Sequence, residues 1–273
     1  MGFFHRNSSD DNPPPPPLAP SDQGFPANDK HQPDPPPPQY PQPHPTSSYA
    51  STSQPTAPTY AALHLARSDR IRLIGFPDCV VQPVSAAITA IWPGGIQREE
   101  VTEPGIAYEY KLKGNPWYGQ GSEAVPSRRL MSHVLSCLSS QGWHLTCAVD
   151  LSRKEYDKDT LLFRSGPAVP RRVFSVSFNQ GDKTRIIDPP SDAVRDAFVA
   201  AVSPGATQVK LRGYPFMTSK GTNVNHARLL ACRILGTLDE LGWELVGSVD
   251  ISMGTGGGGD GADLDSWFFA NKL

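Results

Sequence analysis

The sequence has few of the features that mark secreted, membrane or metal-binding proteins. It contains four cysteines among 273 residues, and no pair of them has a CxxC or similar metal-ligand spacing. No apolar run approaches the roughly 20 residues that cross a bilayer, and the N-terminal apolar stretch is too short for a secretory signal. We therefore expect a cytoplasmic protein with reduced, mostly buried cysteines, namely Cys79, Cys137, Cys147 and Cys232.

The sequence is also poor in patterns that indicate catalysis or nucleic-acid binding. A net charge of −2 provides no general attraction to nucleic acid. None of the seven histidines belongs to an HExxH or triad-like signature, and there is no P-loop or nucleophile elbow. Residues 254–259 match the letters GxGxxG, but they lead toward another expected strand instead of a phosphate-binding helix. We expect no enzymatic activity, no cofactor, no metal site and no nucleic-acid partner.

Proline, by contrast, is abundant and unevenly placed. Of the 29 prolines, 17 lie before residue 59. Each proline fixes φ and removes a backbone donor, so this segment cannot form helices or central strands. Residues 1–62 are therefore predicted to be a disordered, proline-rich tail, and residues 63–273 to be folded.

The folded part contains the same unit twice. Residues 111–117, KLKGNPW, match residues 210–216, KLRGYPF. Further along, Gly142-Trp143 and Gly242-Trp243 match at nearly the same offset, as do the Val-Asp pairs that follow each of them. Matches at this density indicate an internal duplication, with a first repeat over residues 63–166 and a second over residues 167–273.

Each repeat is predicted to be a βαβαββ unit of an α/β protein, with a small mixed α+β sheet. Gly142 and Gly242 suit the left-handed position that ends the second helix of each unit. Because such a unit leaves an apolar sheet edge or face, we expect the repeats to pack as one pseudo-twofold domain in a monomer. Two independent domains are the alternative. The expected elements are strands at 71–76 and 173–178, helices at 84–92 and 192–202, strands ending at Gly114 and Gly213, helices at 126–141 and 224–241, strands beginning at Trp143 and Trp243, and strands at 160–164 and 266–270.

The loops after Gly114 and Gly213 lead from a strand into a helix N-terminus, where backbone N–H groups favour anions. This position makes both loops candidate sites for an anionic ligand. Other interpretations stay open: the aromatic residues can plug the end of the core, and the arginines can form structural ion pairs with Asp150 and Asp250, which the duplication repeated. The candidate ligand-binding residues are Lys113, Trp117, Arg128, Phe216 and Arg228.

The tail contains two short motifs for protein recruitment. Pro37-Pro38-Gln39-Tyr40 is a PPxY sequence, and Pro55-Thr56-Ala57-Pro58 is a PTAP sequence. The first resembles the ligands of WW domains in HECT-type ubiquitin ligases, and the second is similar to the motif that the UEV domain of ESCRT-I recognises. Together they resemble the paired late-domain motifs of viral Gag proteins and of endosomal cargo adaptors, which implies association with endosomes. The resemblance covers the partner-binding residues Pro37, Pro38, Tyr40, Pro55, Thr56, Ala57 and Pro58, and no part of the repeats.

Three functions are consistent with these observations. The first is a non-enzymatic adaptor whose tail recruits the ligase and ESCRT-I while the repeats hold cargo or a partner. The second is a module that binds a small anionic ligand or a phospholipid headgroup through the strand-to-helix loops. The third is a hydrolase of unrecognised type, whose mark would be a pocket with converging His, Asp or Cys side chains. The sequence favours the adaptor.

Overall fold

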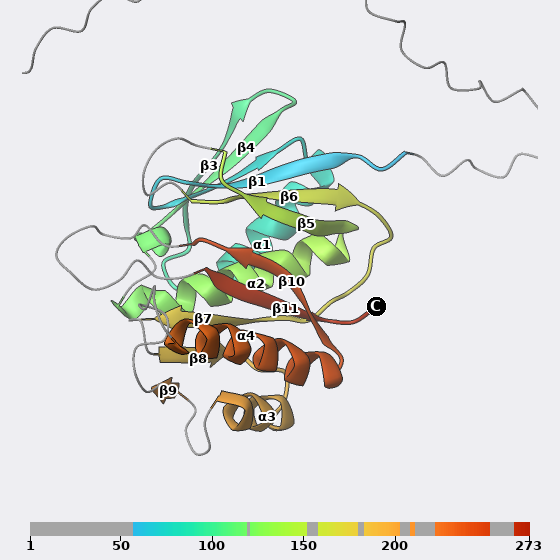
Figure 1. Cartoon of the computed structure of the whole chain (residues 1–273). Coiled ribbons are helices and arrows are strands. Elements are labelled where there is room, and N and C mark those ends of the chain that lie inside the picture. The colour runs from blue at the N-terminus through green and yellow to red at the C-terminus, as the bar shows by residue number, and fades with distance from the viewer. Residues whose placement is uncertain are drawn as a thin grey trace, which may run out of the picture. The chain divides into compact units, whose positions relative to one another are not determined.

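The structure of the chain is a computed structural model (Figure 1). It describes residues 57–118, 121–151, 158–179, 183–202, 208–210, 222–251 and 265–273. Several residues singled out in the sequence lie outside these ranges: Pro37, Pro38, Tyr40, Pro55, Thr56, Phe216 and the segment 254–259.

The first repeat contains a six-stranded sheet, sheet A, in which all described neighbours are antiparallel. Apolar residues alternate along its central strands, so that Leu63 and Leu65 of β1 and Ile71 and Leu73 of β2 are buried on one face. The strands, in spatial order, are β3 (Ile96–Glu103), β4 (Ala107–Leu112), β2 (Arg70–Ile74), β1 (Tyr60–Ala66), β6 (Thr160–Ser165) and β5 (Trp143–Val149).

The second repeat contains a separate five-stranded sheet, sheet B, whose described neighbours are again antiparallel. Strand β7 lies between β8 and β11, just as β1 lies between β2 and β6 in sheet A. The structural counterpart of β7 is therefore β1. The strands, in spatial order, are β10 (Trp243–Val249), β11 (Ser266–Asn271), β7 (Val173–Asn179), β8 (Lys183–Ile187) and β9 (Gln208–Lys210).

The described residues form four α-helices, close to the ranges that the apolar spacing predicts. In the first repeat these are α1 (Val81–Ile91) and α2 (Ala124–Ser140), and in the second α3 (Asp192–Val202) and α4 (Thr222–Glu240). Pro126 is tolerated because it lies in the first turn of α2. Gly142 and Gly242 follow α2 and α4 with φ values of 81° and 84°, which confirms the predicted helix ends.

The predicted βαβαββ order and the predicted mixed sheet are wrong for both repeats, because two strands precede the first helix of each repeat and all described strand neighbours are antiparallel. In the second repeat the strand that was not predicted is β8. In the first repeat it is β1. An additional hairpin partner, β1, precedes β2, and its first three residues belong to the segment that the sequence assigned to the tail. The turn between β1 and β2 places Arg67, and no glycine, at a positive φ of 54°, so the usual turn signal is missing. A second hairpin joins β3 and β4 through Gly105, at φ 71°, within the single strand that the sequence predicted.

The two repeats share a core. Val249, Ile251 and Phe268 of the second repeat are buried in the main apolar cluster of the first. Helix α2 contacts β5 of its own sheet and β7 and β8 of the other, so it lies between the two sheets (Figure 1). A smaller cluster, with Phe174 and Phe269, lies between sheet B and its own helices α3 and α4.

The contacts between the repeats are asymmetric for the helices. No comparably extensive contact joins α4, the counterpart of α2, to β1 or β2 in the described part of the chain. The strands β5 and β10, which are equivalent, do contact each other. Polar bonds from α2 strengthen its contact with the second repeat: Arg129 binds Asp188 through two bonds of 2.5 and 2.7 Å, and the Ser136 hydroxyl donates to the carbonyl of Arg171.

Candidate functional site

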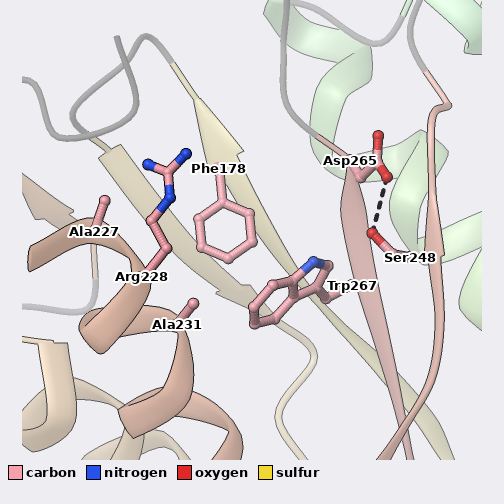
Figure 2. A pocket seen from close by; sticks show the side chains of 7 residues that line it. All are labelled: Phe178, Ala227, Arg228, Ala231, Ser248, Asp265 and Trp267. Atoms are coloured by element: carbon pink, nitrogen blue, oxygen red, sulfur yellow. Dashed lines mark hydrogen bonds between the residues drawn. The ribbon is translucent and has the colours of Figure 1, made fainter. Parts of the chain in front are cut away.

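A pocket of about 410 Å³ lies in the second repeat, between the N-terminal half of α4 and one end of sheet B. This volume lies within the range of small-molecule sites. Figure 2 shows the described side chains that line it: Phe178, Ala227, Arg228, Ala231, Ser248, Asp265 and Trp267.

Two aromatic rings form the apolar part of this pocket. The ring centroids of Phe178 and Trp267 are 4.9 Å apart, and the ring planes meet at 76°, an edge-to-face contact that fixes both rings. Opposite them, Ala227 and Ala231 stand one turn apart on α4. The small alanine side chains leave space in front of the rings.

The polar groups lie at two ends of the pocket and carry opposite charges. Arg228 rises from α4 beside Phe178, while Ser248 and Asp265 lie beyond Trp267 (Figure 2). The Ser248 hydroxyl donates to the Asp265 carboxylate at 2.9 Å, which holds that carboxylate in place. Arg228 and Asp265 are both exposed to solvent. The pocket can therefore bind a molecule that has an apolar middle and polar ends of opposite charge.

The equivalent place in the first repeat is filled by core side chains. Leu161 stands in β6 where Trp267 stands in β11, as the pairing registers of the two sheets show. Met131 of α2 takes the position of Ala231, and both Met131 and Leu161 are completely buried. The corresponding arginine, Arg128, is 1% exposed there. The duplication thus left a closed core in one repeat and an open pocket in the other.

The structure does not bring the sequence-predicted ligand residues together in one site. Trp117 is completely buried, and its indole N–H donates to the Arg70 carbonyl at 2.8 Å. It therefore packs in the core and does not line a ligand site, in agreement with the interpretation that the aromatic residue plugs the end of the core. Arg128 donates to Ser266 Oγ at 2.9 Å and to the Ala124 carbonyl at 2.8 Å, and so links α2 to β11. Lys113 is exposed. Arg228 alone of the described candidates lines the pocket.

The aspartates that the repeats share lie near the junction between them. The backbone N–H of Asp250 donates to the Asp159 carboxylate at 2.9 Å, which ties the second repeat to the first. Burial raises the pKa of Asp159, and the nearby carboxylates Asp265 and Asp150 raise it further. The Asp159 carboxylate is thus a structural hydrogen-bond acceptor whose ionised form is disfavoured by its surroundings.

Three of the four cysteines are more exposed than expected. Cys79, Cys147 and Cys232 are exposed and Cys137 is half-buried, and all four are free thiols. The expectation of mostly buried thiols is wrong because Cys147 lies on an edge strand and Cys232 on the outer side of α4. Within the described ranges, no group of three or more His, Cys, Asp or Glu side chains could hold a metal ion, and no helix is long and apolar enough to cross a bilayer.

These features define a two-repeat α/β domain with two antiparallel sheets and an open pocket in its second repeat. The chain belongs to a family of uncharacterised domains, whose sequence model matches residues 59–164 and again residues 172–270. The two matches agree with the internal duplication. No curated protein and no solved structure is significantly similar to the chain.

Proposed function

We propose that the protein is a non-enzymatic adaptor whose tail recruits a WW-domain ubiquitin ligase and ESCRT-I, while the two repeats hold a partner. The observation that carries this proposal is the presence of PPxY and PTAP within residues 37–58, immediately before the folded repeats. Prolines of such segments favour polyproline II, an extended conformation that aromatic grooves bind at low entropic cost.

The position of the PTAP sequence relative to the first strand supports this proposal. Ala57 and Pro58 are exposed. The next residue, Thr59, is anchored to the end of β6, because its N–H donates to Ser165 Oγ at 2.8 Å and its carbonyl accepts from the Ser165 N–H at 2.9 Å. Residues 41–54 can extend by up to about 50 Å, which leaves room for two receptors at once. When the two receptors belong to one assembly, binding of the first motif raises the effective concentration of the second motif at its own receptor.

We further propose that the repeats act as one rigid body, in which, among the extensive contacts of the described elements, the contact between β5 and β10 follows the pseudo-twofold relation. This contact joins equivalent strands, whereas the contact of α2 with β7 has no reciprocal of similar extent among the described residues. The adaptor would then offer the motifs of the tail and the pocket of the second repeat as separate binding sites.

A pulldown with four variants tests the recruitment. Tyr40→Ala is expected to lose the WW-domain ligase and to keep ESCRT-I, and Pro55→Leu is expected to do the reverse. Tyr49→Ala and Pro20→Leu are matched controls, because they make the same substitutions in the tail outside both motifs. Unchanged recovery of both receptors by Tyr40→Ala and Pro55→Leu would contradict the adaptor proposal.

The alternative function is an anion site in the strand-to-helix loops. Two of its candidate residues, Trp117 and Arg128, are buried and therefore not accessible to a ligand. One observation still favours a ligand-binding role: Arg228 lines an open pocket. A small-ligand function therefore moves from the loops to that pocket.

A further inference from the structure

We propose that the pocket of the second repeat binds a small organic molecule with an aromatic ring between an anionic end and an amino end. This inference stands independently of the tail, because the pocket consists of residues of the folded repeat. It concerns a single site, lined by the pair Phe178 and Trp267, by Ala231, and by the polar residues Arg228, Ser248 and Asp265.

The ring of the ligand follows from the shape of the apolar part. Phe178 is 5% exposed, and its edge-to-face contact with Trp267 holds both rings in place. Trp267 is partly exposed and lines the pocket. A flat ring can stack against a fixed aromatic wall and gain both apolar burial and the preferred aromatic geometry. The small side chain of Ala231 on the facing helix leaves space in front of this wall.

The two ends of the ligand follow from the charges. Arg228 presents a guanidinium group at the α4 side, and guanidinium groups bind carboxylates through paired, charge-assisted hydrogen bonds. Asp265, held by the Ser248 hydroxyl at 2.9 Å, presents an acceptor at the other side (Figure 2). A molecule with both groups can bond at both ends of the pocket, whereas a molecule with one group can bond at one end.

The comparison of the repeats shows that the pocket is not a general gap in this fold. One change removes volume: Ala231 stands where the first repeat has the buried Met131. A second change alters the wall, because the partly exposed Trp267 stands where Leu161 is buried. Replacing methionine by alanine at a core position normally costs stability through the cavity that it leaves. A ligand that fills the space would offset this cost.

The probe is 4-(aminomethyl)benzoate, a ring with a carboxylate and an ammonium group at opposite ends. It is titrated into the full chain by calorimetry, beside 4-methylbenzoate and 4-methylbenzylamine, which each lack one charged group. We expect a dissociation constant of roughly 0.1 to 1 mM for the probe, the range for a ligand of about ten heavy atoms. Each single-group compound is expected to bind about tenfold more weakly.

Three variants locate the binding. Ala231→Met restores the side chain of the first repeat and is expected to abolish binding by filling the pocket. Arg228→Gln is expected to weaken the probe about tenfold and to leave 4-methylbenzylamine unaffected. Arg233→Gln removes the same charge from an exposed position of α4 outside the pocket and is expected to change nothing.

Thermal unfolding of each variant shows whether it is folded, and Arg228→Gln decides the matter if Ala231→Met does not fold. The proposal is overturned by absence of binding at millimolar probe, by equal binding of the probe and both single-group compounds, or by unchanged affinity in Arg228→Gln. Tyr40→Ala in the tail leaves this binding intact, so failure here and failure of the adaptor proposal are separate results.

Discussion

Two buried or half-buried carboxylates show how local partners decide the energetics of this fold. Glu109 is 1% exposed on sheet A and accepts bonds from Arg70 and from Arg72, the latter at 2.6 and 3.0 Å. Burial alone would raise its pKa, but the bonds from the two arginines outweigh burial, and the pKa lies below its ordinary value. For Asp159, no cation among the described residues offsets burial in this way, and its pKa is raised.

Glu109→Gln is expected to lower the free energy of unfolding by roughly 2 to 3 kcal/mol at neutral pH, because two arginines lose their carboxylate. This loss of free energy is small for the removal of one partner of a buried ion pair, because Arg72 is about one-third exposed and solvent screens its charge. A carboxyl with a lowered pKa stabilises the fold above its unfolded pKa, and this contribution is lost as pH falls through the folded pKa. Urea unfolding from pH 7 down to pH 3 measures the difference between variant and wild type.

Asp159→Asn is the matched control for this titration. Its side chain keeps an oxygen acceptor for the Asp250 N–H and removes a carboxylate whose pKa is raised. A raised carboxyl pKa destabilises the fold at high pH, so this variant is expected to gain stability relative to wild type as pH rises. The account of both groups is contradicted if the two stability differences change with pH in the same direction.

At the scale of the element, the equivalent helices α2 and α4 are each followed by a glycine, but the two glycines have different surroundings. A Cβ at Gly142 would lie 2.6 Å from the Gly166 carbonyl oxygen, whereas a Cβ at Gly242 would meet nothing within 4 Å. Both residues have positive φ, so both substitutions carry the strain of a left-handed conformation.

Gly242→Ala is therefore expected to cost about 1 kcal/mol, from the left-handed conformation alone. Gly142→Ala is expected to cost at least about 1 kcal/mol more, because the linker that carries Gly166 must move away. Chemical denaturation of the two variants measures both costs. Equal costs would show that the linker yields freely at this point.

The sequence predicted those elements whose signals are local. Helical apolar spacing and terminal glycines located α1 to α4, and the paired tryptophans located the starts of β5 and β10. The β1–β2 hairpin escaped prediction because Arg67 takes the turn position that usually requires glycine. The division into two antiparallel sheets depends on long-range pairing, which no local signal records.

The site was less predictable than the fold. Arg228 was a candidate because it repeats Arg128, but identical residues have different environments, one buried between the repeats and one beside an open pocket. The informative positions were those that differ, namely Met131 against Ala231 and Leu161 against Trp267. Both differences are visible in the sequence, but their meaning depends on knowing that α2 is covered by sheet B and that α4 has no such cover among the described residues.

At the scale of the whole molecule, the shared core predicts that the repeats are not independent in stability. Phe268 and Phe269 are neighbours in β11 and are both completely buried, but Phe268 packs in the cluster of the first repeat and Phe269 in that of the second. Phe268→Ala is expected to cost about 3 to 5 kcal/mol. It is also expected to speed hydrogen exchange in β1 and β2, which are distant in sequence.

Phe269→Ala is the control, with a similar cost and its first effect on exchange in α3 and α4. If Phe268→Ala leaves exchange in sheet A unchanged while destabilising sheet B, the repeats are separate domains and the shared core does not couple them.

The central proposal is that this molecule joins two receptors through its tail while the two repeats form one body. Sedimentation of the purified full chain with an isolated WW domain and an isolated UEV domain tests this claim most directly. The account predicts a ternary complex with one copy of each component, and its reduction to two-component complexes in Tyr40→Ala and in Pro55→Leu. Sedimentation of all three proteins as separate species would contradict it.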